Sequence, residues 1–249
     1  MRAPLVDYHC HLDLYRDCES VFAAARSSDV EIFAVTTTPL AWEQNCKLAM
    51  GASNVRVGLG LHPHLVGTPS ADVRTFERLA PRVRFIGEIG LDAGPKWYKS
   101  FALQTEIFSN ALELCVDYPG KVLSIHCVRA YPELFSLLDK HWSDDAGTLI
   151  LHWFSGSLSE AKRAMECGCF FSVNSEMIRR PQGRRLLEAL PIQRLLTETD
   201  GPFISDLGGN AFRPADVRDT VAAIASIKDM PLDEVISTLW RNVQTVEAL

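Results

Sequence analysis

Residues 83–126 read VRFIGEIGLDAGPKWYKSFALQTEIFSNALELCVDYPGKVLSIH, and they contain a strand, a helix and a second strand in succession. The runs at 83–91 and 121–126 are largely apolar without strict alternation, which is typical of parallel strands covered on both faces. Between them, residues 101–118 place apolar side chains along one side at helical spacing. The stretch therefore predicts a β–α–β unit.

The same alternation of strand-like and helical segments continues through the rest of the chain. Eight runs have strand character, at 5–9, 32–38, 55–61, 83–91, 121–126, 147–154, 169–174 and 194–199. Among the helical segments, Ser157 and Glu160 form a capping box for a helix that stops at Gly168. Pro231 suits the first turn of a helix over 231–247. The pattern predicts an α/β fold, a (β/α)₈ TIM barrel, and we expect a single domain over residues 1–249.

The composition narrows the class of protein. The formal net charge is −6, and an acidic chain is not expected to wrap long duplex nucleic acid, because that binding needs many Lys/Arg–phosphate contacts. No apolar run reaches the roughly 18 residues of a membrane span, and the start MRAPLVDYHCHLD has no signal-peptide pattern. We therefore expect a cytoplasmic protein without a membrane partner.

The chain has seven cysteines, an odd number, and none forms a Cys-x-x-Cys pair. They are expected to be reduced, buried thiols of a cytosolic protein. Cys167 and Cys169 could be considered as metal ligands, but the end of a helix followed by the start of a strand is the favoured interpretation.

Polar side chains recur where the predicted strands end, and in α/β barrels the working residues come from these C-terminal ends. Four histidines and two carboxylates hold such positions: His9, His11, Glu88, His126, His152 and Asp200. His9 and His11 are two residues apart, so on a strand both rings point to the same side. One such residue alone is usually structural, but the convergence of six on one rim predicts a metal centre.

The donor set indicates the kind of metal and chemistry. Imidazole with carboxylate suits zinc, manganese or iron better than calcium. A glutamate between two histidine groups can bridge two ions, and such a pair generates a hydroxide nucleophile near neutral pH and stabilises a phosphoryl transition state. The residues therefore predict a metal-dependent hydrolase of phosphodiester bonds.

At these positions the sequence resembles the TatD-like metal-dependent deoxyribonucleases, a branch of the amidohydrolase-type metal barrels. The shared segments are DYHCHLD (7–13), GLHPH (60–64), GEIGLD (87–92), IHCVRA (125–130), LHWFSG (151–156) and ETDGP (198–202). GEIGLD and HWFSG are specific signals, whereas His-x-His alone is weak.

The resemblance implies two divalent metal ions, zinc, manganese or magnesium. It assigns His9, His11, Glu88 and Asp200 to one ion, and Glu88, His126 and His152 to the other. It makes Asp200 and Glu88 the catalytic carboxylates, with Asp200 orienting the attacking water or taking its proton. It also places His64 near the scissile phosphate.

Two segments depart from the family pattern. The family usually has Arg two residues after the histidine of its fifth strand, but here Val128 stands there and Arg129 follows. Later the family often has Asn-Glu-Pro, where this chain has Phe212-Arg213-Pro214. We expect the metal chemistry to survive both departures, whereas the contacts with phosphate and the substrate preference should differ from those of the family.

Candidate substrate contacts are basic or aromatic. Arg129 is one, and Arg179 and Arg180 before Pro181 are others. A basic cluster of this kind is usually a solvated face, but it could also bind an anionic strand end. Trp153 follows a ligand histidine, and barrel–helix packing is favoured over base stacking for it.

The favoured function is a TatD-like DNase that processes single-stranded DNA or 3′ ends. One alternative is a small-molecule amidohydrolase of the lactonase or deaminase type, although such enzymes often have a carboxylated lysine where Glu88 stands. Another is a binding module without catalysis, which the six intact ligands argue against. The start HCHLDLY (9–15) is similar to a subgroup found in bacterial anti-phage cassettes, the Qat system, which would imply antiviral defence and partner proteins from that system.

Overall fold

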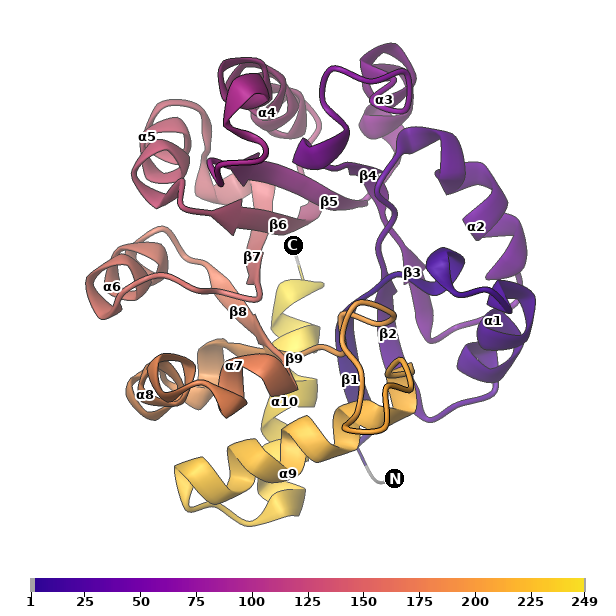
Figure 1. The fold of residues 1–249 in the computed structure, drawn as a ribbon, viewed down its shortest axis with the longest axis vertical. Helices are drawn as coiled ribbons and strands as arrows, with labels where there is room; N and C mark the ends of the chain where they lie inside the picture. Colours follow the sequence, from indigo (N-terminus) through magenta and orange to yellow (C-terminus); the bar gives the residue numbers. More distant parts are fainter. Residues whose placement is uncertain (1–2, 249) are drawn as a thin grey trace.

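The computed structural model describes residues 3–248 and contains strands and helices in regular alternation (Figure 1). The strands are β1 (Leu5–Cys10), β2 (Val30–Ala34), β3 (Val55–Val57), β4 (Leu59–Leu61), β5 (Phe85–Asp92), β6 (Lys121–Val128), β7 (Gly147–His152), β8 (Phe170–Val173) and β9 (Leu195–Thr197). The helices are α1 (Cys18–Arg26), α2 (Trp42–Leu48), α3 (Val73–Leu79), α4 (Phe101–Asp117), α5 (Tyr131–His141), α6 (Leu158–Glu166), α7 (Ser175–Arg179), α8 (Pro181–Ala189), α9 (Val217–Lys228) and α10 (Leu232–Val246).

The strands form a ring with helices around the outside, as Figure 1 shows. Strands β1 to β3 form one parallel sheet and β4 to β9 a second. Backbone hydrogen bonds join the two sheets, from Gly58 to Ala34 at 2.8 Å and from Asp200 to His9 at 3.0 Å. The predicted TIM barrel is therefore confirmed, with β3 and β4 together in one of its eight strand positions.

The predicted strands 32–38 and 55–61 differ from the observed ones, and Thr36 gives the reason. Its hydroxyl donates to the carbonyl of Gly58 at 2.9 Å and accepts from the N–H of Gly60 at 2.9 Å. A side chain thus takes over hydrogen bonds that a continuous strand would make. The predicted strand 55–61 divides at Gly58, and the predicted strand 32–38 ends at Ala34.

The helix predictions agree more closely with the structure. Helix α4 matches the segment predicted at 101–118, and the Ser157–Glu160 capping box is present at the start of α6. Pro231 lies one position outside α10, as its N-cap, rather than in its first turn. Among residues 3–248, no helix is both long and apolar enough to cross a membrane.

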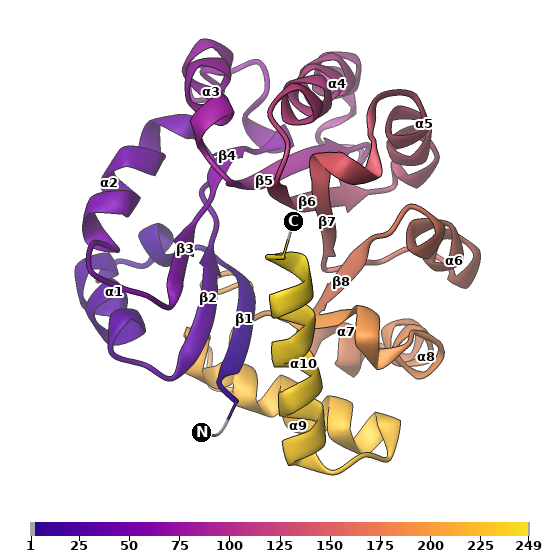
Figure 2. The same cartoon turned by 180° about the vertical axis from the view of Figure 1, so that it is seen from behind.

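Helix α10 closes one end of the barrel, which Figure 2 shows from behind. The side chain of Asn242 donates to the carbonyls of Ile192 and Leu195, both at 2.7 Å. These bonds fix α10 across the start of β9. The opposite end, where the strands finish, is left for the polar side chains.

The seven cysteines are free thiols, and four of them are buried. No cysteine belongs to the metal-type clusters found among residues 3–248. This agrees with the structural interpretation of Cys167 and Cys169.

Candidate metal centre

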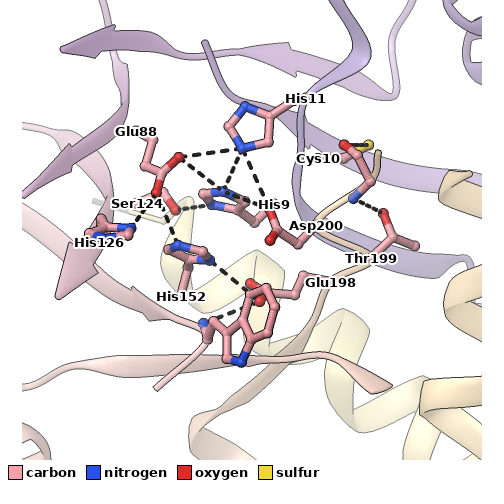
Figure 3. A network of polar contacts seen from close by, with 12 residues as sticks. His9, Cys10, His11, Glu88, Ser124, His126, His152, Glu198, Thr199 and Asp200 are labelled. Carbon is pink, nitrogen blue, oxygen red and sulfur yellow. Dashed lines mark hydrogen bonds and ion pairs between the residues drawn. The ribbon is translucent and has the colours of Figure 1, made fainter. Parts of the chain in front are cut away.

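Glu88 lies at the middle of a buried cluster at the C-terminal end of the barrel (Figure 3). Its two carboxylate oxygens face different histidines. Oε2 lies 3.6 Å from Nε2 of His9 and 3.3 Å from Nε2 of His11. Oε1 lies 2.9 Å from Nδ1 of His126 and 3.0 Å from Nε2 of His152. One carboxylate thus connects two separate pairs of imidazoles.

Asp200 completes the first of these groups. Its Oδ1 lies 3.6 Å from Nε2 of His9 and 3.5 Å from Nε2 of His11. Asp200 has a left-handed backbone, with φ of 49°, and the preceding Thr199 donates through its N–H and its hydroxyl to the carboxylate of Asp7, at 2.8 Å and 2.6 Å. These bonds hold the turn that directs Asp200 into the cluster.

The close approach of β5 and β6 depends on Gly90, which follows Glu88 by two residues. Gly90 has φ of +140°, and a Cβ there would lie 2.0 Å from the carbonyl oxygen of His126. A side chain would push the strands apart. Glycine therefore keeps Glu88 and His126 within contact distance.

Burial and charge act against each other in this cluster. Burial favours the neutral form of Glu88, but the surrounding imidazoles, His62 and His152 foremost, hold its pKa well below the usual range. Burial also opposes protonation of His11, yet Asp200 and Glu88 raise the pKa of His11 to about 9. Glu88 is therefore anionic, and the cluster favours positive charge beside it.

The residues fit divalent metal ions. Nε2 of His9 and Nε2 of His11 lie 3.3 Å apart and point to the same space as the oxygens of Glu88 and Asp200. Nitrogen and oxygen donors that lie this close together suit a cation such as zinc or manganese. Two groups of donor atoms that lie within 4.8 Å of one another share Glu88: one adds His9 and His11, the other His62 and His126.

His62 is a member of the cluster that the sequence did not assign. Its Nδ1 accepts the backbone N–H of His64 at 3.0 Å, so the proton of a neutral ring lies on Nε2. Nε2 is 3.1 Å from Oε1 of Glu88, and burial lowers the pKa of His62 to about 4 although Glu88 partly offsets this. His62 is therefore placed as a hydrogen-bond donor to Glu88. The spacing of two from His64 was the signal that could have found it.

Two further carboxylates lie behind the histidines. Asp92 Oδ2 is 3.3 Å from Nε2 of His126, and Glu198 Oε1 is 3.5 Å from Nδ1 of His152. Asp92 lies in the segment GEIGLD, four residues after Glu88, and Glu198 lies in ETDGP, two residues before Asp200. That period of two on a strand was the available signal.

Comparison with known proteins identifies the family of this chain. The family described as "TatD related DNase" matches residues 6–247. The chain belongs to the TatD family of metal-dependent hydrolases.

Relatives of this TatD-family chain match over nearly their whole length. The 3′-5′ ssDNA/RNA exonuclease TatD of Klebsiella pneumoniae is 33% identical over 239 residues, covering 92% of this chain and 86% of the relative. The human deoxyribonuclease TATDN3 is 27% identical and covers 96% of this chain and 92% of the relative. The crystal structure of YjjV, a TatD homologue from Escherichia coli, aligns over 100% of both chains with a TM-score of 0.87 and 27% identity.

A pocket of about 430 Å³ opens above the cluster in this TatD-family barrel. Beyond the cluster itself, its walls include His64, Cys127, Val128, Trp153, Ser155, Arg180 and Phe203. Trp153, for which packing was favoured, both packs against the core and lines the pocket. Phe203 is 63% exposed and meets the ring of His11 edge-on, at 5.1 Å between centroids.

The predicted substrate contacts divide into two groups. His64 and Arg180 line the pocket. Arg129 is exposed and Arg179 forms an ion pair with Glu176 at 2.5 Å, and neither belongs to the pocket wall. Val128, which replaces the usual arginine of the TatD family, gives that wall an apolar side chain.

Proposed function

We propose that this chain hydrolyses phosphodiester bonds of single-stranded DNA or of DNA 3′ ends with two divalent metal ions. The observation that carries the proposal is Glu88, whose two oxygens face two different histidine groups. In this assignment His9, His11, Glu88 and Asp200 hold one ion, and Glu88, His126 and His152 hold the other. The ions, when bound, would lower the pKa of a water and neutralise charge on the phosphoryl group.

The side chains around the pocket have separate roles in activating water, in positioning Glu88 and in binding the substrate. Asp200, at the pocket wall, orients the attacking water and accepts its proton. Glu88 keeps the two metal positions together, and the Nε2–H of His62 fixes its carboxylate. Arg180 has no ion-pair partner among residues 3–248, so its charge is available for a phosphate of the substrate.

The shape of the pocket favours a strand end over a duplex. A cavity of about 430 Å³ is in the range that holds one small ligand, and its floor is the buried cluster. The aromatic rings of Trp153 and Phe203 can contact a base, and aromatic contacts tolerate every base. The names of the Klebsiella exonuclease and the human deoxyribonuclease are consistent with such a substrate.

The small-molecule amidohydrolase remains the alternative that the assay must separate. The decisive experiment incubates the remetallated protein with single-stranded DNA labelled at either end, with duplex DNA, with a cyclic phosphodiester and with a lactone. Shortening of the single strand from its 3′ end is the expected result. Turnover of the lactone alone would contradict the proposal.

Three broader expectations belong to the same proposal. A cytoplasmic location is supported by the seven free cysteines, and a single domain by the match of one family over residues 6–247. A role in anti-phage defence, with partner proteins of such a system, rests on the segment HCHLDLY (9–15). Protection of a host strain against phage, lost in the Asp200→Asn variant, would test it.

A further inference from the structure

The two histidines that face Oε1 of Glu88 each have a carboxylate on their outer side. His126 directs Nδ1 to Glu88, and its Nε2 lies 3.3 Å from Oδ2 of Asp92. His152 directs Nε2 to Glu88, and its Nδ1 lies 3.5 Å from Oε1 of Glu198. Figure 3 shows Glu198 on the side of His152 away from Glu88.

The histidines that face Oε2 of Glu88 differ in this respect. Nδ1 of His9 lies 2.7 Å from the hydroxyl of Ser124, a neutral group. Nδ1 of His11 has no hydrogen-bond partner among the described residues. The outer environment of the four imidazoles is therefore asymmetric, because a carboxylate oxygen lies within 3.5 Å of the outer nitrogen in His126 and His152, whereas the outer nitrogens of His9 and His11 have a hydroxyl and no hydrogen-bond partner respectively.

Asp92 is held firmly in place. Its Oδ1 accepts the N–H of Gly94 at 2.6 Å, and its own N–H donates to the buried side chain of Gln104 at 2.8 Å. Its Oδ2 also lies 2.5 Å from Nε2 of His64 in the pocket wall. One carboxylate oxygen thus contacts a metal-facing histidine and a substrate-facing histidine.

Glu198 is completely buried, yet no lysine or arginine is paired with it in the part of the chain that the structure describes. Its Oε1 accepts the N–H of Trp153 at 3.1 Å and the side-chain amide of Asn174 at 2.7 Å. Trp153 has φ of 42°, a left-handed conformation that is rare for a large residue. Oε2 of Glu198 and Nδ1 of His152 both lack a hydrogen-bond partner among residues 3–248. Oε1 of Glu198, 3.5 Å away, is the acceptor that a proton on Nδ1 of His152 would face.

We propose that Asp92 and Glu198 are positioning residues that set the affinity of one metal position, the one formed by Glu88, His126 and His152. Each carboxylate holds a proton on the outer nitrogen of its histidine, so the inner nitrogen presents a lone pair and becomes a stronger donor. The inference rests on the proposed two-metal site. It assigns no separate ion to the group His64, Asp92 and His126, because the outer nitrogen of His126 carries the proton.

The test is a titration of the metal-free protein with cobalt(II), monitored by visible absorption and by competition with a chelator, without nucleic acid. Asp92→Asn and Glu198→Gln should each weaken one of the two binding steps about 10- to 100-fold and leave the other unchanged. Ser124→Ala, the matched control behind His9, should leave that same step unchanged. Circular dichroism and thermal melting establish whether each variant folds. If Glu198→Gln does not fold, because residue 198 is buried, the Asp92→Asn variant alone decides the test.

The outcomes separate this inference from the proposed function. Two binding steps in the native protein that neither carboxylate variant alters would overturn the positioning role. Equal weakening of both steps by all three variants would overturn it too, because the effect would be general. A native protein that binds one ion at saturation would contradict the two-metal proposal itself, and the inference with it.

Discussion

The backbone N–H of Asp200 donates to the carbonyl oxygen of His9 at 3.0 Å. The same two residues bring Oδ1 and Nε2 of their side chains to 3.6 Å. The contact that joins the segment after the last strand, β9, to the first strand, β1, therefore also brings together two side chains of the candidate metal centre. A barrel that failed to close would separate Asp200 from His9, two of the proposed ligands of the first ion.

The first prediction concerns metal content. Protein saturated with zinc or manganese should contain two ions per chain, and EDTA should remove them without unfolding the barrel, whose core is apolar. At a metal concentration 100-fold above Kd, each of the two ions stabilises the fold by about 2.7 kcal/mol, so the melting temperature should fall by roughly 10–20 °C after EDTA. Elemental analysis and melting curves measure both. A ratio that saturates at one would contradict the assignment of two ligand groups.

The second prediction separates two adjacent arginines. Arg180 lines the pocket, whereas Arg179 is paired with Glu176. Arg180→Ala should raise KM for single-stranded DNA and reduce the salt slope of binding by about 0.7, the value for one phosphate contact. Arg179→Ala is the matched control and should alter neither. Equal effects of the two variants would show that the cluster acts only through its overall charge.

The third prediction concerns the exposed ring of Phe203. If it contacts a base, Phe203→Ala should cost about 1–3 kcal/mol of binding, which raises KM about 5- to 150-fold for single-stranded DNA. Metal content should not change. Leu207→Ala, in the same loop and 98% exposed, is the control for loss of an apolar side chain outside the pocket. A KM in Phe203→Ala equal to that of the control would exclude base contact.

The sequence was sufficient for the barrel and for the position of its six candidate ligands. Strands with apolar runs and helices between them leave few topologies, and in a barrel all strand ends meet at one rim. His9, His11 and Asp200 could therefore be brought together without coordinates. Their separations, and the fact that Glu88 faces both groups, agree with that expectation.

Other features could not be predicted, because they depend on which atom faces which. Arg179 and Arg180 are neighbours in sequence, but α7 ends between them, so one contacts Glu176 and the other reaches the pocket. His62 acts as a donor only because its Nδ1 meets the N–H of His64. Thr36 shortens two strands through one hydroxyl. Such roles follow from tertiary contacts and leave little trace in local pattern.

The last prediction distinguishes proton transfer from metal holding. Asn at position 200 keeps an oxygen for the metal and has nearly the same shape, but it cannot accept a proton from water. Asp200→Asn should therefore fold, retain two ions and lose hydrolysis by roughly 10²-fold or more. Glu88→Gln should lose activity together with metal. Each oxygen of Glu88 faces a different histidine group, and an amide has only one oxygen and no negative charge. Metal analysis beside kcat for single-stranded DNA separates the two variants. Near-native turnover of Asp200→Asn at saturating metal would mean that the ions alone activate the water, and that Asp200 serves only to hold them.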